Sequence, residues 1–176
     1  MRRKYLLIVV SGICVAGLAV ALFLVFHHPS GLLFVNEIPT VRDGDTIDYQ
    51  QHSFCLPTQG VRLLGIDAPE IKDPEGKNAQ EAFHALVDEC DGRLWIDAPP
   101  EAQNDPHCRL IAILLVHRHD KVSVNERLVA EGWAHIYKMQ DSSDRLKNFE
   151  QRLLKAQIEA AINRRGRWAE GDDVVI

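Results

Sequence analysis

Five charged residues in three short stretches of this chain have types and spacings that could do chemistry. The stretch VRLLGIDAPE (61–70) begins like a buried strand, yet it contains Arg62 near its start and Asp67 and Glu70 at its end. A core strand normally excludes such groups, because an ionised side chain that leaves water needs a partner. Asp45 lies in a second acidic stretch, VRDGDTI (41–47). These charges are therefore expected to have partners that are not all part of the protein.

A metal ion is the first such partner that the spacing predicts. If TIDYQ and VRLLGI form an antiparallel hairpin centred near residue 56, Asp45 lies opposite Asp67 with the Cβ atoms about 5 Å apart. Two carboxylates that close repel each other unless a cation stands between them. Oxygen ligands at the rim of a sheet suit Ca²⁺, and Ala68 adds a backbone carbonyl. The predicted metal ligands are Asp45, Asp67 and Ala68.

The remaining charged residues predict hydrolysis of a phosphodiester. Glu70 lies just beyond the expected metal site, where a carboxylate can deprotonate a bound water. Arg62 and Arg109 provide planar cationic forks that match phosphate oxygens and can stabilise the charge that develops on them. Each feature also has a structural interpretation. DGD is common in turns, Arg62 could form an ion pair with Asp67, and Arg109 could simply begin its strand.

The elements that must position these residues predict a small barrel in an α+β arrangement. Apolar runs separated by turn residues indicate strands, and apolar stripes with capping residues indicate three helices. The expected strands are LLFVNEI, TVRDG, TIDYQ, VRLLGI, RLWID (93–97), RLIAILLVH (109–117) and WAHIY. The expected helices cover 79–90 after Asn78, a short segment from Ser123 to Gly132, and a long segment from Ser142 or Ser143 to Gly166.

The N-terminus predicts a membrane anchor. Residues 5–26 form an uncharged run of 22 residues, which is long enough to cross a bilayer core of about 30 Å. It follows MRRK and lacks a convincing cleavage site, so residues 1–31 are expected to be a signal anchor with a cytoplasmic N-terminus. Residues 32–176 then form one extracytoplasmic domain. If the segment is cleaved, the domain is secreted.

Charge and cysteines limit the partners. The formal net charge is −5, with 20 Lys and Arg against 25 Asp and Glu, so any nucleic-acid site must be local rather than a broad basic surface. Beyond Cys14 in the apolar run, Cys55, Cys90 and Cys108 are an odd set that permits one disulfide at most. Three isolated thiols are the alternative, and the sequence does not identify a pair.

The motifs resemble those of the staphylococcal nuclease, or thermonuclease, family over about residues 36–170. The matching segments are DGDT (43–46), RLLGIDAPE (62–70), Arg109 at the start of a strand, VNERLVAEGWA (124–134) and GRW (166–168). The resemblance implies a five-stranded OB-fold barrel with three helices. It also implies Ca²⁺-dependent cleavage of DNA and RNA that leaves 3′-phosphate ends.

The same resemblance assigns roles to individual residues. Asp45 and Asp67 match the calcium-binding aspartates, and Ala68 matches the position that gives a carbonyl. Glu70 matches the general base, while Arg62 and Arg109 match the two phosphate-binding arginines. One segment departs from the family pattern, because His107-Cys108 replaces the usual Tyr-Gly before Arg109. That change could alter the path of the loop and the direction of Arg109.

The sequence is compatible with three functions. The favoured one is a membrane-anchored monomeric nuclease that prefers single strands, since an OB-fold face offers stacking and backbone contacts. The second is a tethered module that binds single-stranded nucleic acid or a protein without turnover. The third is a structural domain with a structural calcium site. DNA and RNA are not distinguished, and no protein partner is evident.

Overall fold

The computed structural model describes residues 31–49, 60–91, 93–100, 105–107, 109–139 and 143–170. The expected anchor at residues 5–26 lies outside these ranges. Within the described part of the chain, no helix has both the length and the apolar character needed to span a bilayer.

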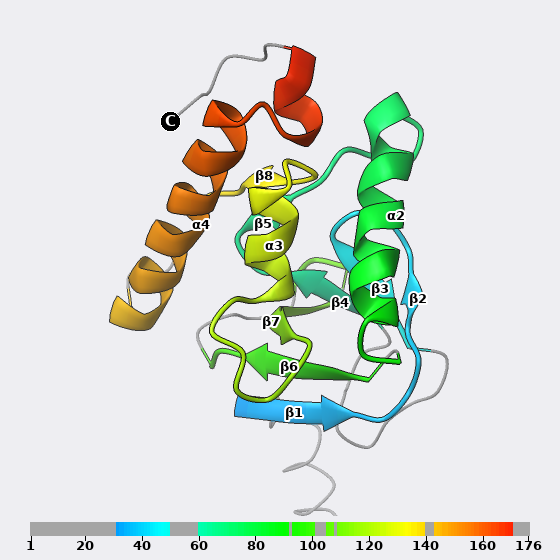
Figure 1. Cartoon of the computed structure of the whole chain (residues 1–176). Coiled ribbons are helices and arrows are strands. Elements are labelled where there is room, and N and C mark those ends of the chain that lie inside the picture. The colour runs from blue at the N-terminus through cyan, green and yellow to red at the C-terminus, as the bar shows by residue number, and fades with distance from the viewer. Residues whose placement is uncertain are drawn as a thin grey trace, which may run out of the picture.

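The described segments form an α+β fold, as predicted, with three α-helices above a curled sheet (Figure 1). The strands are β1 (Gly31–Val35), β2 (Thr40–Val41), β3 (Thr46–Asp48), β4 (Gly60–Leu63), β5 (Ile66–Asp67), β6 (Leu94–Ala98), β7 (Leu110–Leu115) and β8 (His135–Ile136). The helices are α2 (Pro74–Asp88), α3 (Val124–Ala130) and α4 (Asp144–Ile162), followed by the 3₁₀ turn η1 (Gly166–Glu170).

The main sheet has the strand order β1-β6-β7-β4-β3-β2, and β5 pairs separately with β8. All pairs are antiparallel except β4 with β7. The two outer strands, β1 and β2, are joined by residues 36–39 alone, so the sheet must curl back on itself. Counting β1 and β2 as one interrupted strand gives the five barrel strands that the resemblance implies.

The helices are close to the predictions, with two corrections at their ends. The apolar stripe of α2 is buried at Ala79 and Phe83 as predicted, but the helix begins at Pro74 rather than at residue 79. Proline is favoured in the first turn, where its missing N–H costs no hydrogen bond. The first turn of α2 is polar, so the apolar pattern did not show where the helix begins. The long helix α4 begins after Ser143 as expected, but it ends at Ile162, before Gly166.

The helix α3 begins with the predicted capping box. The Ser123 hydroxyl accepts from the Glu126 backbone N–H, and the Glu126 carboxylate accepts from the Ser123 N–H. Asn125 is fully buried and holds α3 against the barrel. Its side chain accepts from the Leu114 N–H and donates to the Leu64 carbonyl, at 3.0 Å in each case.

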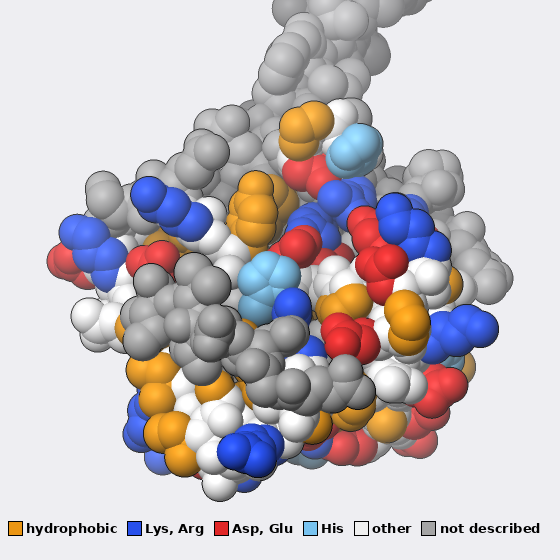
Figure 2. Space-filling model, turned by 90° about the horizontal axis from the view of Figure 1, so that it is seen from above, with side chains coloured by type: hydrophobic (Ala, Val, Ile, Leu, Met, Phe, Trp, Pro, Cys, Tyr) orange, Lys and Arg blue, Asp and Glu red, His pale blue; other side chains and the backbone are white. Residues whose placement is uncertain are grey.

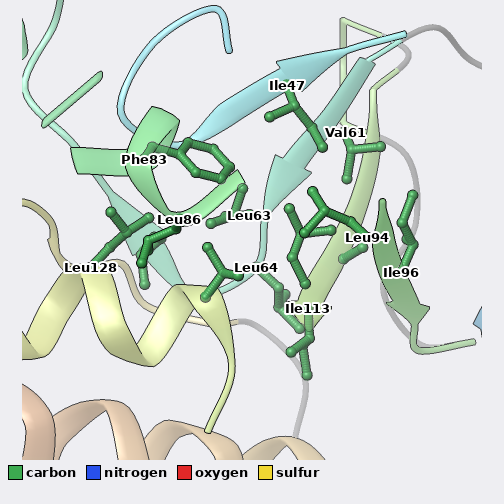
Figure 3. Close-up of a cluster of buried hydrophobic side chains, with 14 of the residues drawn as sticks. Ile47, Val61, Leu63, Leu64, Phe83, Leu86, Leu94, Ile96, Ile113 and Leu128 are labelled. Carbon is green, nitrogen blue, oxygen red and sulfur yellow. The ribbon is translucent and has the colours of Figure 1, made fainter. Parts of the chain in front are cut away.

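Buried apolar side chains from the strands and from the inner faces of the helices fill the core (Figure 3). Phe83 and Leu86 from α2 and Leu128 from α3 point toward Leu63 and Leu64 at the end of β4 (Figure 3). This packing fixes the position at which β4 leaves the sheet. The charged residues that follow β4 are therefore held by a rigid support.

Candidate active site

Arg62 on β4 joins the two aspartates that the sequence predicts as metal ligands. Its Nη1 forms an ion pair with Asp45 Oδ1, and its Nη2 lies 2.6 Å from Asp67 Oδ1. The Asp45 side chain is 5% exposed and that of Arg62 is 20% exposed. Burial alone lowers the pKa of Arg62, but the neighbouring Asp45 and Asp67 more than offset it, so the pKa is raised. The three charges thus form one partly buried cluster.

The register of β3 and β4 differs from the predicted one. Thr46 lies opposite Arg62, and Asp48 lies opposite Gly60, so the ladder is offset by four residues from the expected pairing of Asp45 with Asp67. The hairpin centre is therefore nearer the N-terminus than residue 56. Asp67 still reaches the cluster, because β4 ends at Leu63 and the chain turns through Gly65 (φ +74°) into β5.

Asp45 accepts hydrogen bonds from three directions. The Thr46 hydroxyl donates to Oδ1 at 2.9 Å, the Ala68 backbone N–H donates to Oδ2 at 3.0 Å, and Arg62 donates to Oδ1. Gly44 must be a glycine here, since a Cβ atom at that position would lie 2.6 Å from the Ala68 Cβ. DGD is thus more than a surface turn, because its glycine allows the Asp45 segment to pack directly against residue 68.

Arg109, the residue just before β7, reaches the same cluster. Its Nη1 donates to the Thr46 hydroxyl at 3.1 Å, and Thr46 in turn donates to Asp45. Asp105 fixes the direction of Arg109, because its carboxylate accepts from the Arg109 backbone N–H at 2.9 Å and from Nε at 2.7 Å. It also accepts from the His107 N–H at 3.0 Å. The altered His107-Cys108 segment therefore still leaves Arg109 directed toward Thr46, although Cys108 itself lies outside the described residues.

Glu70 lies apart from these contacts. It is exposed, and within the described part of the chain its carboxylate has no hydrogen bond or ion pair. Its backbone is well fixed, since its carbonyl accepts from the Asp73 N–H at 2.8 Å and a Cβ atom at Gly76 would lie 2.0 Å from that carbonyl oxygen. The structure thus presents Glu70 on a fixed backbone three residues after Asp67, with its carboxylate available to solvent.

The side chains around Arg62 are mainly carboxylates, the kind of ligand that a hard divalent cation prefers. Asp43 lies beside Asp45, and burial together with the Asp45 charge raises the pKa of the Asp43 carboxyl. Arg62 accompanies the carboxylates of Asp43, Asp45 and Asp67, and the charge of Arg109 is balanced by Asp105, so the cluster has an excess of negative charge. No group of three His, Cys, Asp or Glu side chains converges on a metal position in the described ranges. A cation here would need backbone carbonyls and water as further ligands, which Ca²⁺ accepts.

Besides Asp43, four contributors to the site were not predicted: Thr46, Asp105, His135 and Arg167. Thr46 links Asp45 to Arg109, and Asp105 directs Arg109. His135 lies opposite Asp67 in the β5–β8 ladder, and Arg167 contacts His135. Only Asp105 left a signal, as an acidic residue four positions before an arginine. The others depend on pairings between distant segments, which sequence spacing does not show.

On the face of the molecule seen in Figure 2, the charge of the described side chains is mixed rather than uniformly basic. In the view from above, Lys and Arg side chains alternate with Asp and Glu side chains across the face (Figure 2). The expectation of a local site therefore stands, since any contact with phosphate depends on a few arginines.

Of the cysteines discussed above, Cys90 is placed with Sγ 3.1 Å from the Val87 carbonyl oxygen, and Cys55 and Cys108 lie outside the described residues.

Known proteins have sequences similar to that of this chain. The chain is 28% identical over 189 residues to "Protein ParB" of Escherichia coli, covering 96% of this chain and 88% of that protein. It is 29% identical over 134 residues to an "Uncharacterized endonuclease" of Escherichia coli O157:H7, covering 76% of each. Residues 60–170, which include Arg62, Asp67, Glu70 and Arg109, match the family model described as "Staphylococcal nuclease homologue". The chain therefore belongs to the staphylococcal nuclease homologue family.

Proposed function

We propose that this protein is a calcium-dependent nuclease that hydrolyses phosphodiester bonds in DNA and RNA, with a preference for single strands. The observation that carries the proposal is the continuous set of contacts Asp105–Arg109–Thr46–Asp45–Arg62–Asp67, with Glu70 three residues beyond it. Membership of a nuclease family and the similarity to a protein named as an endonuclease support it.

Asp45, Asp67 and the Ala68 carbonyl are the groups that would hold Ca²⁺. When bound, the ion would polarise the phosphate oxygens and make a coordinated water more acidic. Asp45 is suited to this role because its position is fixed by Thr46 and by the Ala68 N–H. Asp67 is more exposed, at 40%, so it can face both the cation and solvent.

Glu70 would act as the general base. A water molecule attacks the phosphorus, its proton passes to the Glu70 carboxylate, and the bond from phosphorus to the 5′ oxygen breaks while that oxygen takes a proton from solvent water. A 3′-phosphate and a 5′-hydroxyl remain. The exposure of Glu70 suits this role, because its carboxylate is not already used by another side chain in the described ranges. A well-placed general base contributes about 10²–10⁴-fold in rate.

The arginines would bind the phosphate. Each guanidinium has five N–H donors. The described contacts of Arg62 use Nη1 and Nη2 and leave Nε–H, while Arg109 has a second Nη1 hydrogen beyond its bond to Thr46. These remaining donors can meet the phosphate oxygens as negative charge builds on them.

The products test the proposal. The full chain is incubated with labelled single-stranded DNA, double-stranded DNA and RNA in the presence of Ca²⁺. We expect faster cleavage of the single strands, with ends that accept a new 3′ nucleotide only after phosphatase treatment. Ends that carry a 3′-hydroxyl without this treatment would contradict the assigned direction of bond cleavage.

A second candidate is a module that binds single strands without turnover. The observation that favours it is an aromatic pair on the outer face of β1 and β6. The Phe34 and Trp95 rings have centroids 4.8 Å apart, and the Arg118 guanidinium lies 5.4 Å from the Trp95 ring centre. Aromatic and guanidinium faces of this kind stack on bases. This candidate predicts binding that is lost with Trp95→Ala and unchanged with Glu70→Gln.

The location of the protein is a separate part of the proposal. Residues 5–26 would anchor the chain with its N-terminus in the cytoplasm and residues 32–176 outside, as a monomer. The support is the 22-residue uncharged run and its basic N-terminal flank. Protease added to intact cells should digest the domain but leave the anchor with the membrane. Complete protection of the domain would contradict this orientation.

A further inference from the structure

His135 faces the side of Asp67 that Arg62 does not occupy. The two residues are register partners in the short β5–β8 ladder. Asp67 Oδ1 contacts Arg62, whereas Asp67 Oδ2 lies 3.9 Å from His135 Nε2. That separation is too long for a direct hydrogen bond but close enough for electrostatic attraction or a bridging water. The carboxylate of Asp67 thus has basic groups on two sides.

Arg167 determines which nitrogen of His135 carries the proton. Its Nη1 lies 3.0 Å from His135 Nδ1. A guanidinium can only donate, so Nδ1 must accept, and in the neutral ring the proton is then on Nε2. Nε2 is the nitrogen that faces Asp67. The arrangement therefore directs an N–H toward the carboxylate oxygen that Arg62 leaves available.

The C-terminal turn, Gly166–Glu170, fixes Arg167 in this place. The Arg167 backbone N–H donates to the Gly132 carbonyl at 3.1 Å, and Trp168 is buried. Gly132 has φ +79°, and a Cβ atom there would lie 2.2 Å from the Arg165 carbonyl oxygen. Only glycine allows the end of α3 and the C-terminal turn to approach this closely. The GRW motif at 166–168 thus has a structural connection to Asp67.

We propose that the C-terminal turn prepares Asp67 for calcium, with Arg167 and His135 as positioning residues. The inference rests on the proposed function, since it assumes that Asp67 is a metal ligand. Groups that hold metal-ligating carboxylates in place change metal affinity by about 10–100-fold when removed. The distance of 3.9 Å between His135 and Asp67 places the expected effect at the lower end, about tenfold.

Calcium affinity measured by calorimetry on the full chain tests this inference, with the melting temperature without calcium recorded for every variant. His135→Ala should raise the calcium Kd about tenfold. His135→Gln should restore most of the affinity, because its side-chain amide can donate from nearly the same place as Nε2–H. His84→Ala, at an exposed position on α2, is the matched control and should bind calcium normally.

A double variant tests the connection to the C-terminal turn. If Arg167 acts only through His135, Arg167→Ala should add nothing to the loss caused by His135→Ala. Losses that multiply would overturn that part of the inference. Normal calcium affinity in His135→Ala would overturn the whole of it, as would equal losses in His135→Ala and His135→Gln. If the wild-type chain itself binds no calcium, the proposed function fails as well, so the two failures are distinguishable.

Discussion

Arg62 lies on β4, and Arg109 lies immediately before the neighbouring parallel strand β7, but the two arginines are held in different ways. Arg62 joins carboxylates from two separate segments, Asp45 and Asp67. Arg109 takes its carboxylate from its own loop, since Asp105 is four residues away. Gly60 gives Arg109 room on β4, because a Cβ atom there would lie 3.1 Å from the Arg109 Cγ. Arg62 therefore links the carboxylates of the site to one another, whereas Arg109 is held by Asp105 and contacts the site through Thr46.

Because of this difference, changes to the two arginines should have different effects on calcium binding and on catalysis. Arg62 balances part of the negative charge that a cation would also balance, so its removal should affect folding, calcium and catalysis together. Arg109 and Asp105 balance each other. Changes to that pair should alter catalysis and leave the proposed calcium ligands in place.

The largest effect is expected from Arg62→Gln. This change leaves Asp45 buried without its counter-charge, which costs about 3–5 kcal/mol of unfolding free energy when one partner of a buried pair is removed. Cleavage should also fall by about 10²–10³-fold, because a donor to the transition state is lost. Urea unfolding with and without calcium measures the first effect, and calcium should restore part of the loss.

Arg42→Gln is the matched control for this variant. Arg42 also pairs with an aspartate, Asp48, but its side chain is 49% exposed. Exposed pairs contribute about 0–1 kcal/mol. Equal destabilisation by the two variants would mean that Arg62 has no special electrostatic role.

Arg109→Lys should give the next largest effect. Lysine keeps the charge but loses the planar fork that contacts Asp105 and Thr46 together. Cleavage at saturating calcium should fall by about 10²-fold, whereas the calcium Kd should stay as in the wild type. Single-turnover cleavage and calorimetry measure the two quantities. A weaker calcium affinity in this variant would remove the distinction between the two arginines.

The smallest effect is expected from Asp105→Asn, and it depends on pH. Burial raises the pKa of Asp105, but hydrogen bonds from the Arg109 backbone and guanidinium outweigh it, so the pKa lies below its ordinary value of 3.8. A lowered carboxyl pKa stabilises the folded state above the ordinary pKa, and this contribution is lost as the pH falls through the lower folded value. The wild type should therefore lose stability below about pH 4.

Asp105→Asn lacks this contribution, so its unfolding free energy should change less between pH 5 and pH 2 than that of the wild type. Denaturant unfolding at several pH values measures the slopes. Identical slopes would show that the pairing of Asp105 with Arg109 does not contribute to stability. Asp88→Asn is a suitable control, because Asp88 is exposed near the end of α2.

The sequence predicted most of the fold because its local signals agree with the tertiary structure. The capping box at Ser123 and the apolar stripe containing Phe83 depend on residues a few positions apart. The predicted β3–β4 register was wrong, because the register of a hairpin depends on where its turn lies. The turn residues in the connecting sequence, residues 50–59, did not fix that position. The start of α2 was missed because its first turn is polar.

The site was predicted only in part, because some of its contacts join residues that lie far apart in the sequence. Asp45 and Asp67 lie in one cluster as expected, but each of them pairs with Arg62, and they are not a cross-strand pair. The contacts of Thr46 with Arg109 and of His135 with Asp67 join residues 63 and 68 positions apart. No local pattern marks such pairs. The prediction of the chemistry rested on residue types, and the positions of the supporting residues required the structure.

The central claim is that Glu70 activates water in a calcium-dependent site. Its most direct test is cleavage of fluorescent single-stranded DNA by the full chain, with calcium or with a chelator, for the wild type, Glu70→Gln and the control Glu81→Gln, at an exposed position on α2. We predict cleavage by the wild type and Glu81→Gln with calcium, none with the chelator, and a loss of about 10²–10⁴-fold in Glu70→Gln. Cleavage that is unchanged by the chelator or by Glu70→Gln would contradict the claim.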